Sequence, residues 1–445
     1  MLPKTKKMNT HLRNIYALIG IFIFSSLWGQ ENLSLENAIV KGLENNFQVR
    51  ISKENVKSAE LYNSWGTVGR FPSISLGLSS VNRFDNTPST QNPDKRGTLY
   101  TNRLSPFVNV NWLLFNGFSV KMNKEKLELL EHFSLGNSAI VVENTIQSII
   151  LGYYLVLLEQ ERLKVLEQVK NLSGDRYEYE MIRKDLGSAV TFEVLQAKNS
   201  FLSDSTNYLL QKLNVKNAFL NLKLLLGELP EKNFTLVDSF QVEYNNYELK
   251  DLKDKMLSSN KTLQNQYVNQ EILKKNKGIT KSAQYPSISM NAGYDYSKGW
   301  YDLPEPDHYD SYSFDYYANF TLSFNLFNGG NTRRDIQQAG IDEQIGRIET
   351  QQMTQTLDNL LVNQYELYDI RKQLLEVADV NLQSAELNLD IATEKYRNGT
   401  INSFNFRDVQ LIYLNAASRK LNAIYDLIDS HTELLRLTGG IITEN

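Results

Sequence analysis

The sequence contains an internal repeat, and this repeat limits the possible folds more than any other feature. Phe-Pro-Ser-Ile-Ser from Phe71 returns as Tyr-Pro-Ser-Ile-Ser from Tyr285, and Leu-Phe-Asn-Gly ending at Gly117 returns ending at Gly329. The spacings are 214 and 212 residues, so a two-residue length difference lies between the motifs. Loops accept such differences and cores do not. A tandem duplication therefore predicts two similar structural halves.

Composition favours one fused body that does not bind nucleic acid. The 445 residues include only 9 prolines, and no Pro-rich or Gly/Ser-rich linker separates the halves. The formal net charge is -4. Residues 1–29 hold four basic residues and no acid, so the remainder is near -8. That balance argues against a nucleic-acid partner.

Residues 1–29 have the three regions of a secretory signal peptide: a basic start, an apolar stretch from Ile15 to Trp28, and a small Gly29. The alternative is an uncleaved anchor, but ~14 apolar residues are short for a bilayer span. Without cysteine the exported chain has neither a disulfide nor a lipid-acceptor thiol. No second apolar stretch of ~18 residues is expected, so a membrane crossing would use strands.

Alternating residues predict a pair of strands in each half, at about 73–81 and 104–115 and again at about 287–297 and 312–327. Residues 82–103 are rich in Asn, Thr and Asp and are expected to form an exposed loop. From Tyr312 to Leu326 one face is aromatic and apolar and the other is polar. A soluble β-sandwich also alternates. The export signal, the aromatic residues and the polar second face favour a membrane barrel, and since ~8 strands are the fewest that close, several copies must contribute.

Helices are expected elsewhere. Ser34 is predicted to cap a helix from Leu35, and a second helical run is expected from Phe47 to Gly69. Residues 118–226 and 330–438 are each predicted to form a long helical hairpin. The second has a heptad repeat, which is typical of a coiled coil, in Leu361, Tyr368, Leu375, Leu382, Leu389 and Tyr396.

The order of predicted elements resembles the TolC-like outer membrane efflux protein family. A signal peptide is followed by a strand pair and a helical hairpin, and the strand pair and hairpin then occur a second time. The resemblance divides the chain into a signal peptide (1–29), a first repeat (30–227), a connecting equatorial segment (228–259) and a second repeat (260–445). It implies a mainly helical protein with a transmembrane β part, in which a homotrimer closes a twelve-stranded barrel that a periplasmic helical barrel continues. It also implies an exit duct in the outer membrane of a Gram-negative cell, reaching into the periplasm.

The partners implied are a periplasmic adaptor (membrane fusion) protein, an inner-membrane transporter of the RND, ABC or MFS type, and outer-membrane lipid. The duct would serve a tripartite efflux or a type I secretion system and would conduct cargo passively. Family members that gate ions have acids six and nine positions beyond the second tip glycine. These positions hold Asn405 and Asp408 here, so one acid is missing, and the first copy offers Glu193.

Three sets of residues follow from the resemblance. The expected gate comprises Glu193, Asn405 and Asp408. The expected hairpin tips and adaptor contacts are Gly187, Ser188, Gly399 and Thr400, and the strand-to-helix turns are Gly117, Gly329 and Gly330.

No catalytic constellation, metal site or cofactor site is expected. The chain has no cysteine and four histidines, one of them in the signal peptide, and His308 is expected in a solvated loop. Two other classes stay open. A trimeric coiled-coil adhesin or structural outer-membrane protein would use the same heptads without conducting, and an outer-membrane enzyme would need a convergent pocket that the sequence does not show.

Overall fold

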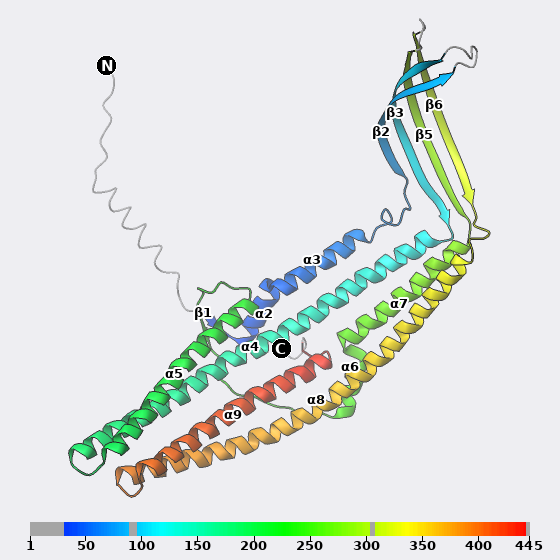
Figure 1. Ribbon diagram of the computed structural model, residues 1–445. Helices are drawn as coiled ribbons and strands as arrows, with labels where there is room; N and C mark the ends of the chain where they lie inside the picture. Colours follow the sequence, from blue (N-terminus) through cyan, green and yellow to red (C-terminus); the bar gives the residue numbers. More distant parts are fainter. Residues whose placement is uncertain (1–30, 89–95, 303–307, 442–445) are drawn as a thin grey trace, which may run out of the picture. The chain divides into compact units, whose positions relative to one another are not determined.

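The computed structural model describes residues 31–88, 96–302 and 308–441 (Figure 1). The expected signal peptide lies outside these residues. Packing divides the chain into two compact units, and each takes segments from both sequence repeats. The first, here called the helical unit, comprises the chain up to Ser52, Ala139–Lys261 and the chain from Gln355. The second, the strand unit, comprises Lys53–Ser138 and Thr262–Thr354.

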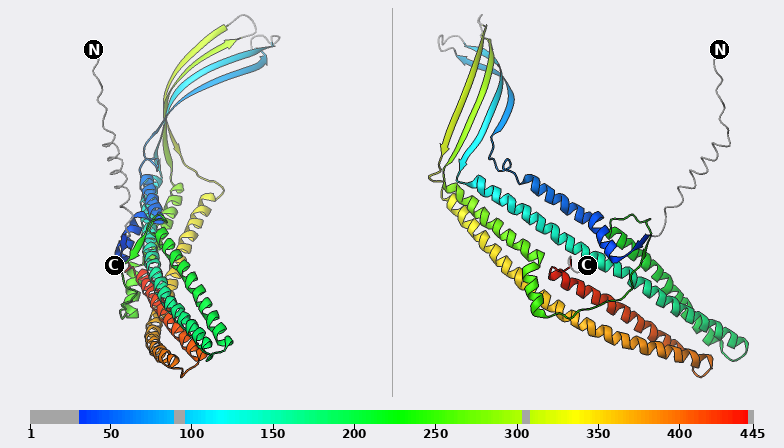
Figure 2. Two further views of the ribbon diagram at one scale, coloured as in Figure 1. Left: turned by 90° about the vertical axis from the view of Figure 1, so that its left-hand side faces the viewer. Right: turned by 180° about the vertical axis from the view of Figure 1, so that it is seen from behind.

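The strand unit contains one antiparallel sheet of four strands in the order β2-β3-β5-β6. Figures 1 and 2 show the four strands side by side. Their bounds are β2 Ser73–Pro88, β3 Arg96–Asn116, β5 Ser287–Asp302 and β6 His308–Ser323.

The strands differ in length from those predicted. Most of the expected loop 82–103 is strand, because its polar residues pair across the hairpin, as Asn82 does with Asn102. Backbone pairing does not depend on the polarity of a side chain. His308, expected in a loop, is the first residue of β6 and pairs with Asp302. Residues 324–327, expected to continue β6, lie beyond its end at Ser323.

The duplication is visible in the helices. The long helices α4 (Ser119–Asp185) and α8 (Asn331–Arg397) have 67 residues each. The returning helices α5 (Thr191–Leu225) and α9 (Ser403–Leu437) have 35 each. The predicted hairpins are therefore present in both halves, with equal lengths.

Short helices precede each strand pair and extend the repeat. These are α2 (Leu35–Asn45) and α3 (Phe47–Tyr62) in the first half, and α6 (Leu249–Ser259), α7 (Lys261–Lys281) and the 3-10 turn η1 (Ser282–Gln284) in the second. The cap expected at Ser34 is present, since its Oγ accepts from the N–H of Asn37 at 3.2 Å. The helix expected to reach Gly69 ends at Tyr62. The chain then turns, and Gly69 has φ +77°.

Matching asparagines show that α2 and α6 are repeat counterparts. Asn46 follows α2 and its Nδ2 donates to the carbonyl of Leu225 at 2.8 Å. Asn260 follows α6 and donates to the carbonyl of Leu437 at 3.0 Å. Residues 249–259 therefore repeat α2. The sequence predicted all of 228–259 to be a connecting segment without a counterpart in the first repeat, and it missed this correspondence. The additional part contains β4 (Phe234–Leu236), which pairs in parallel with β1 (Glu31–Leu33).

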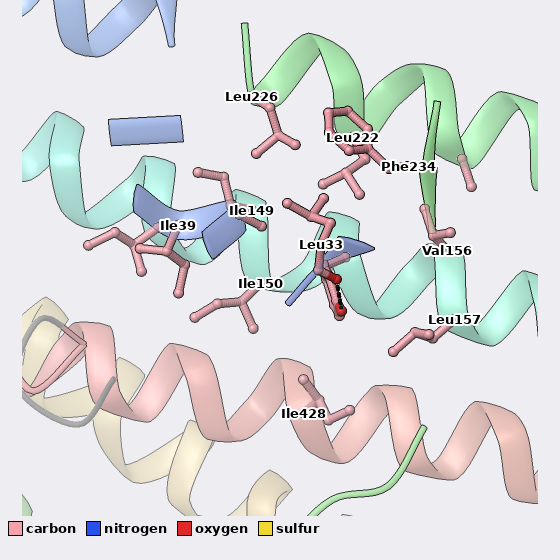
Figure 3. Close-up of a cluster of buried hydrophobic side chains, with 14 of the residues drawn as sticks. Leu33, Ile39, Ile149, Ile150, Val156, Leu157, Leu222, Leu226, Phe234 and Ile428 are labelled. Atoms are coloured by element: carbon pink, nitrogen blue, oxygen red, sulfur yellow. Dashed lines mark hydrogen bonds between the residues drawn. The ribbon is translucent and has the colours of Figure 1, made fainter. Parts of the chain in front are cut away.

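The core of the helical unit joins both repeats around this small sheet (Figure 3). Ile149 and Leu222, from the first hairpin, pack with Leu33, Phe234 and Ile428. The predicted heptad seam is buried where it packs within this unit: Leu361, Tyr368, Leu389 and Tyr396 are at most 5 % exposed.

One described helix, α4, is long and apolar enough to cross a membrane by length and composition alone. Its most apolar 18-residue window has a mean hydropathy of 1.5, and 44 % of it is buried. The expectation of no such stretch was too strict. Ile146, Ile149 and Tyr153 of α4 belong to the core of the helical unit, and a core helix meets the same criterion.

Candidate functional site

The first candidate surface is the apolar face of the sheet. Ile74 pairs with Val110, which pairs with Ala292, which pairs with Ala318, so these side chains share one face. The neighbouring rows add Leu76, Val108, Tyr294, Tyr316, Trp112, Met290 and Phe320. Leu76 and Tyr316 are 82 % and 78 % exposed. An apolar face this open has to be covered by something other than the described part of this chain.

The opposite face is polar. Asn291 Nδ2 donates to the Oδ1 atoms of Asn109 and Asn111 at 2.8 and 2.7 Å, which forms an amide ladder across two strands. Ser73, Ser75, Asn319 and Thr321 lie on the same face. A sheet with one apolar and one polar face has the pattern that a transmembrane barrel wall requires.

The second candidate surface is the pair of hairpin tips. Gly187 and Gly399 end α4 and α8 with φ +74° and +70°. The next residue closes each turn, since the N–H of Ser188 donates to Arg183 O at 2.7 Å and that of Thr400 to Lys395 O at 2.9 Å. The two tips thus share one glycine-dependent turn. A Cβ at either glycine would meet nothing within 4 Å, so both tips are open.

The three expected gate residues lie at the starts of α5 and α9 but differ in their contacts. Glu193 is half-buried, and its Oε2 accepts from the N–H of Val190 at 3.3 Å. Asn405 is exposed, and its N–H donates to Asn402 Oδ1 at 2.9 Å. Both residues therefore take part in helix capping. Asp408 is exposed, and no described residue pairs with it.

An aromatic contact brings these two helix starts together. Phe192 and Phe404, the neighbours of Glu193 and Asn405, stack with ring centroids 6.2 Å apart. The tips lie next to each other in Figure 2. Residues from both repeats therefore lie side by side at the tips.

The strand-to-helix glycines are not equivalent. Gly117 is buried, has φ +52°, and a Cβ there would lie 2.3 Å from the carbonyl oxygen of Ser282. Gly329 and Gly330 also have positive φ, but a Cβ at either has no contact closer than 3.4 Å. Gly117 is therefore needed for close approach as well as for its backbone angle.

Above the tips lies a group that sequence reasoning missed, here called the buried polar cluster: Arg176, Glu180, Asp204, Tyr396, Arg407 and Gln410. Three contacts in it join the two hairpins. Tyr396 Oη donates to Glu180 Oε1 at 2.6 Å. Arg407 donates to both oxygens of Asp204, and Arg176 donates to the carbonyl of Ser403 at 3.2 Å.

Burial perturbs this cluster. Glu180, Asp204 and Arg176 are at most 3 % exposed. Burial, followed by the hydrogen bond to Glu180, raises the pKa of Tyr396 well above its ordinary value. Burial, reinforced by Arg407, lowers the pKa of the Arg176 guanidinium. Arg176 Nε and Nη2 and Gln410 Nε2 are buried without an acceptor in the described structure, which costs stability.

A sequence signal for the cluster exists. Val169, Ser173, Arg176 and Glu180 follow steps of four, three and four along α4, so charged residues occupy a coiled-coil seam. The heptad predicted from the sequence lies on the second long helix, α8, and this seam of α4 was missed. Within the described ranges, no three His, Asp or Glu side chains lie close enough together to hold a metal ion.

The fold is that of outer-membrane channels with solved structures. The Campylobacter jejuni CmeC outer membrane channel matches with a TM-score of 0.75 at 16 % identity, over 91 % of this chain and 85 % of that one. VceC from Vibrio cholerae matches with a TM-score of 0.71 at 15 % identity, over 91 % and 96 %. The open-state Neisseria gonorrhoeae MtrE outer membrane channel matches with 0.68 at 15 % identity, over 92 % and 89 %.

Residues 252–440 match the family model described as outer membrane efflux protein. No curated protein sequence matches the chain. The family-model match confirms the resemblance to the outer membrane efflux protein family that the sequence predicted.

Proposed function

We propose that this protein is an outer-membrane exit duct, and that it conducts cargo passively from the periplasm to the outside of the cell. One observation carries the proposal: a four-stranded sheet has an exposed apolar face and a polar face lined by an amide ladder. Lipid covers such an apolar face and water fills the polar side. The family match supports the same function.

The duct is a homotrimer in this proposal. The edge strands β2 and β6 each pair with one described strand, so each can accept a strand from another copy. Three copies supply twelve strands, whereas four cannot close a barrel.

Exposed apolar stripes on the helices support assembly. Leu195, Leu202 and Leu209 of α5 are spaced seven apart and are each more than half exposed. Ile370 and Val377 of α8 show the same spacing and exposure. A helix buries such a stripe against another helix. In the trimer, α5 and α8 of neighbouring copies provide these partners and form the helical barrel.

The hairpin tips form the entrance. Gly187, Ser188, Gly399 and Thr400 meet the adaptor, while Glu193, Asn405 and Asp408 lie around the opening. The buried polar cluster holds the two hairpins together when the entrance is closed, and its unsatisfied Arg176 and Gln410 donors lower the cost of rearranging it. A tube cannot move cargo uphill, so an inner-membrane transporter supplies the energy in a tripartite efflux or type I secretion system.

Cysteine cross-linking of the strand edges tests the assembly, because the chain has no cysteine of its own. Ser75→Cys on β2 is combined in turn with Cys at Asn319, Thr321 or Ser323 on β6, all of which lie on the polar face. At least one combination should give an oxidised ladder that ends at the trimer. Asn109→Cys on the central strand β3, with the same β6 partners, is the matched control and should give none. A ladder that ends elsewhere, or no ladder in any combination, would reject the trimeric barrel.

A further inference from the structure

A pocket of about 530 Å³ lies where β3 ends and α4 begins. This junction pocket, within the strand unit, is lined by Trp65, Arg70, Trp112, Leu114, Phe118 and Lys121, among others. Trp112 pairs with Met290 in the apolar face of the sheet. The pocket therefore adjoins the helix end of that apolar face. If the sheet is a barrel wall, as proposed above, this end is the boundary between the lipid and the periplasm.

Two cations on the pocket wall lack a close acidic partner. The Arg70 guanidinium lies over the Trp65 ring at 4.6 Å, and no carboxylate of the described structure pairs with it. Lys121 Nζ lies 3.9 Å from Glu125, whose carboxylate is bound at 2.6 Å by Lys275. The pocket thus combines an apolar lining with two cationic side chains: Arg70 has no carboxylate partner in the described structure, and Lys121 has only the 3.9 Å contact with Glu125.

The wall is held in place by specific contacts. The N–H of Arg70 donates to the carbonyl of Trp65 at 3.1 Å, which closes the turn between α3 and β2. Trp112 Nε1 donates to the carbonyl of Arg70 at 2.9 Å and thereby fixes the indole against the turn. The first turn of α4 contains no acid, so the positive end of that helix also faces this region uncompensated.

Phe118 is kept in this pocket at a conformational cost. It is the one non-glycine residue of the described chain with positive φ, at +66°. Its repeat counterpart is Gly330, for which such an angle carries no steric penalty. The Phe118 ring is 62 % exposed and packs edge-on against Phe115.

The second repeat lacks this pocket chemistry. Ile279 and Gln284 stand where the first repeat has Trp65 and Arg70, and the chain there is helical instead of a turn. A role that both repeats share in the duct therefore does not explain the pocket. The pocket is explained by an additional role that only the first repeat has.

We infer that the junction pocket binds one phospholipid of the periplasmic leaflet. The phosphodiester lies between Arg70 and Lys121, because two cationic side chains match one phosphate. One acyl chain runs from the pocket along Leu114 and Trp112 onto the apolar face. The Phe118 ring closes over the glycerol region.

Native mass spectrometry of the delipidated full chain in detergent, titrated with dioleoyl phosphatidylglycerol, tests this inference. Saturable binding of one lipid per chain is expected. Arg70→Ala with Lys121→Ala should weaken that binding about tenfold or more, because two charge-assisted contacts are lost. Phe118→Gly should weaken it about fivefold, through the lost ring contact, while relieving the backbone. Arg333→Ala, the repeat counterpart of Lys121, is the matched control and should leave it unchanged.

Other probes separate the alternatives. Diolein, which lacks the phosphate, should not show the saturable step, and inorganic phosphate should not displace the lipid. Equal binding of diolein would show that the phosphate is not recognised, and equal binding by all variants would show bulk lipid contact only; either result overturns the inference. No saturable step in the intact oligomer would also overturn the inference, because the pocket would then be covered by another copy or by a protein. Pore formation is measured separately on the same samples. A protein that conducts but shows no saturable lipid binding would contradict only this inference. A protein that binds the lipid but forms no pores would contradict only the proposed duct function.

Discussion

Arg407 on α9 donates to both carboxylate oxygens of Asp204 on α5, with the closer distance at 2.6 Å and the other at 2.8 Å. The Asp204 side chain is 3 % exposed and that of Arg407 18 %. This pair joins the first hairpin to the second inside the helical unit. We expect Arg407→Ala to destabilise that unit by about 3–5 kcal/mol, because it leaves a buried carboxylate unpaired. Thermal or denaturant unfolding measures the loss.

The matched control for this prediction is the exposed Lys57–Glu54 pair on α3, whose side chains are 68 % and 70 % exposed. Lys57→Ala should leave the unfolding transition nearly unchanged, because water screens an exposed ion pair. Combining Asp204→Asn with Arg407→Gln removes both charges and should recover part of the loss. Equal effects of Arg407→Ala and Lys57→Ala would show that the buried pair does not hold the hairpins together.

Glu143 on α4 predicts a pH dependence. It is 4 % exposed, and its Oε1 has no hydrogen-bond partner in the described structure. Burial raises the pKa of Glu143 from its ordinary 4.5 to about 7, against the opposing charges of Lys261 and Arg436. Between these two pH values the folded state holds more protons than the unfolded state. Stability should therefore fall by up to about 3 kcal/mol as the pH rises from about 4.5 to 7, and the contribution should be level above that.

Glu143→Gln should remove this slope, because glutamine does not titrate. The measurement is a series of unfolding midpoints from pH 4.5 to 8 for both proteins. Parallel curves would show that Glu143 is not the group responsible.

The two classes of glycine turn predict different responses to the same substitution. Gly399→Ala should cost about 1 kcal/mol, since only its positive φ is penalised. Gly117→Ala should cost at least about 3 kcal/mol, because its Cβ would also lie 2.3 Å from the carbonyl oxygen of Ser282. Unfolding free energies of both variants check the difference. Similar losses would mean that the chain relaxes at Ser282.

The sequence predicted the architecture because its strongest signals are local. The proline-free runs between Gly117 and Gly187 and between Gly330 and Gly399 predict the ends of the long helices to within a residue or two. The alternation after Pro72 gave the start of β2. The sequence did not predict the outer parts of the strands. Asn82 and Asn102 occur as readily in loops as in strands, and only their pairing with each other shows that they belong to strands.

Long-range contacts could not be predicted in the same way. The Tyr396 hydroxyl binds Glu180, 216 residues earlier in the chain, although Tyr396 also fits a plain heptad position. Similarly, α6 repeats α2, but no short motif marks the correspondence, which became clear from the matching contacts of Asn46 and Asn260. The gate residues follow from a family pattern, and their role stays a prediction.

Single-channel conductance of the purified protein in a planar bilayer shows whether the protein is a duct. A steady, low-conductance pore that prefers cations is expected, because the proposed entrance carries Glu193 and Asp408 from every copy. Glu193→Gln with Asp408→Asn should widen the pore or abolish its selectivity. A folded protein that inserts into the bilayer and never conducts would contradict the duct and favour a non-conducting surface adhesin.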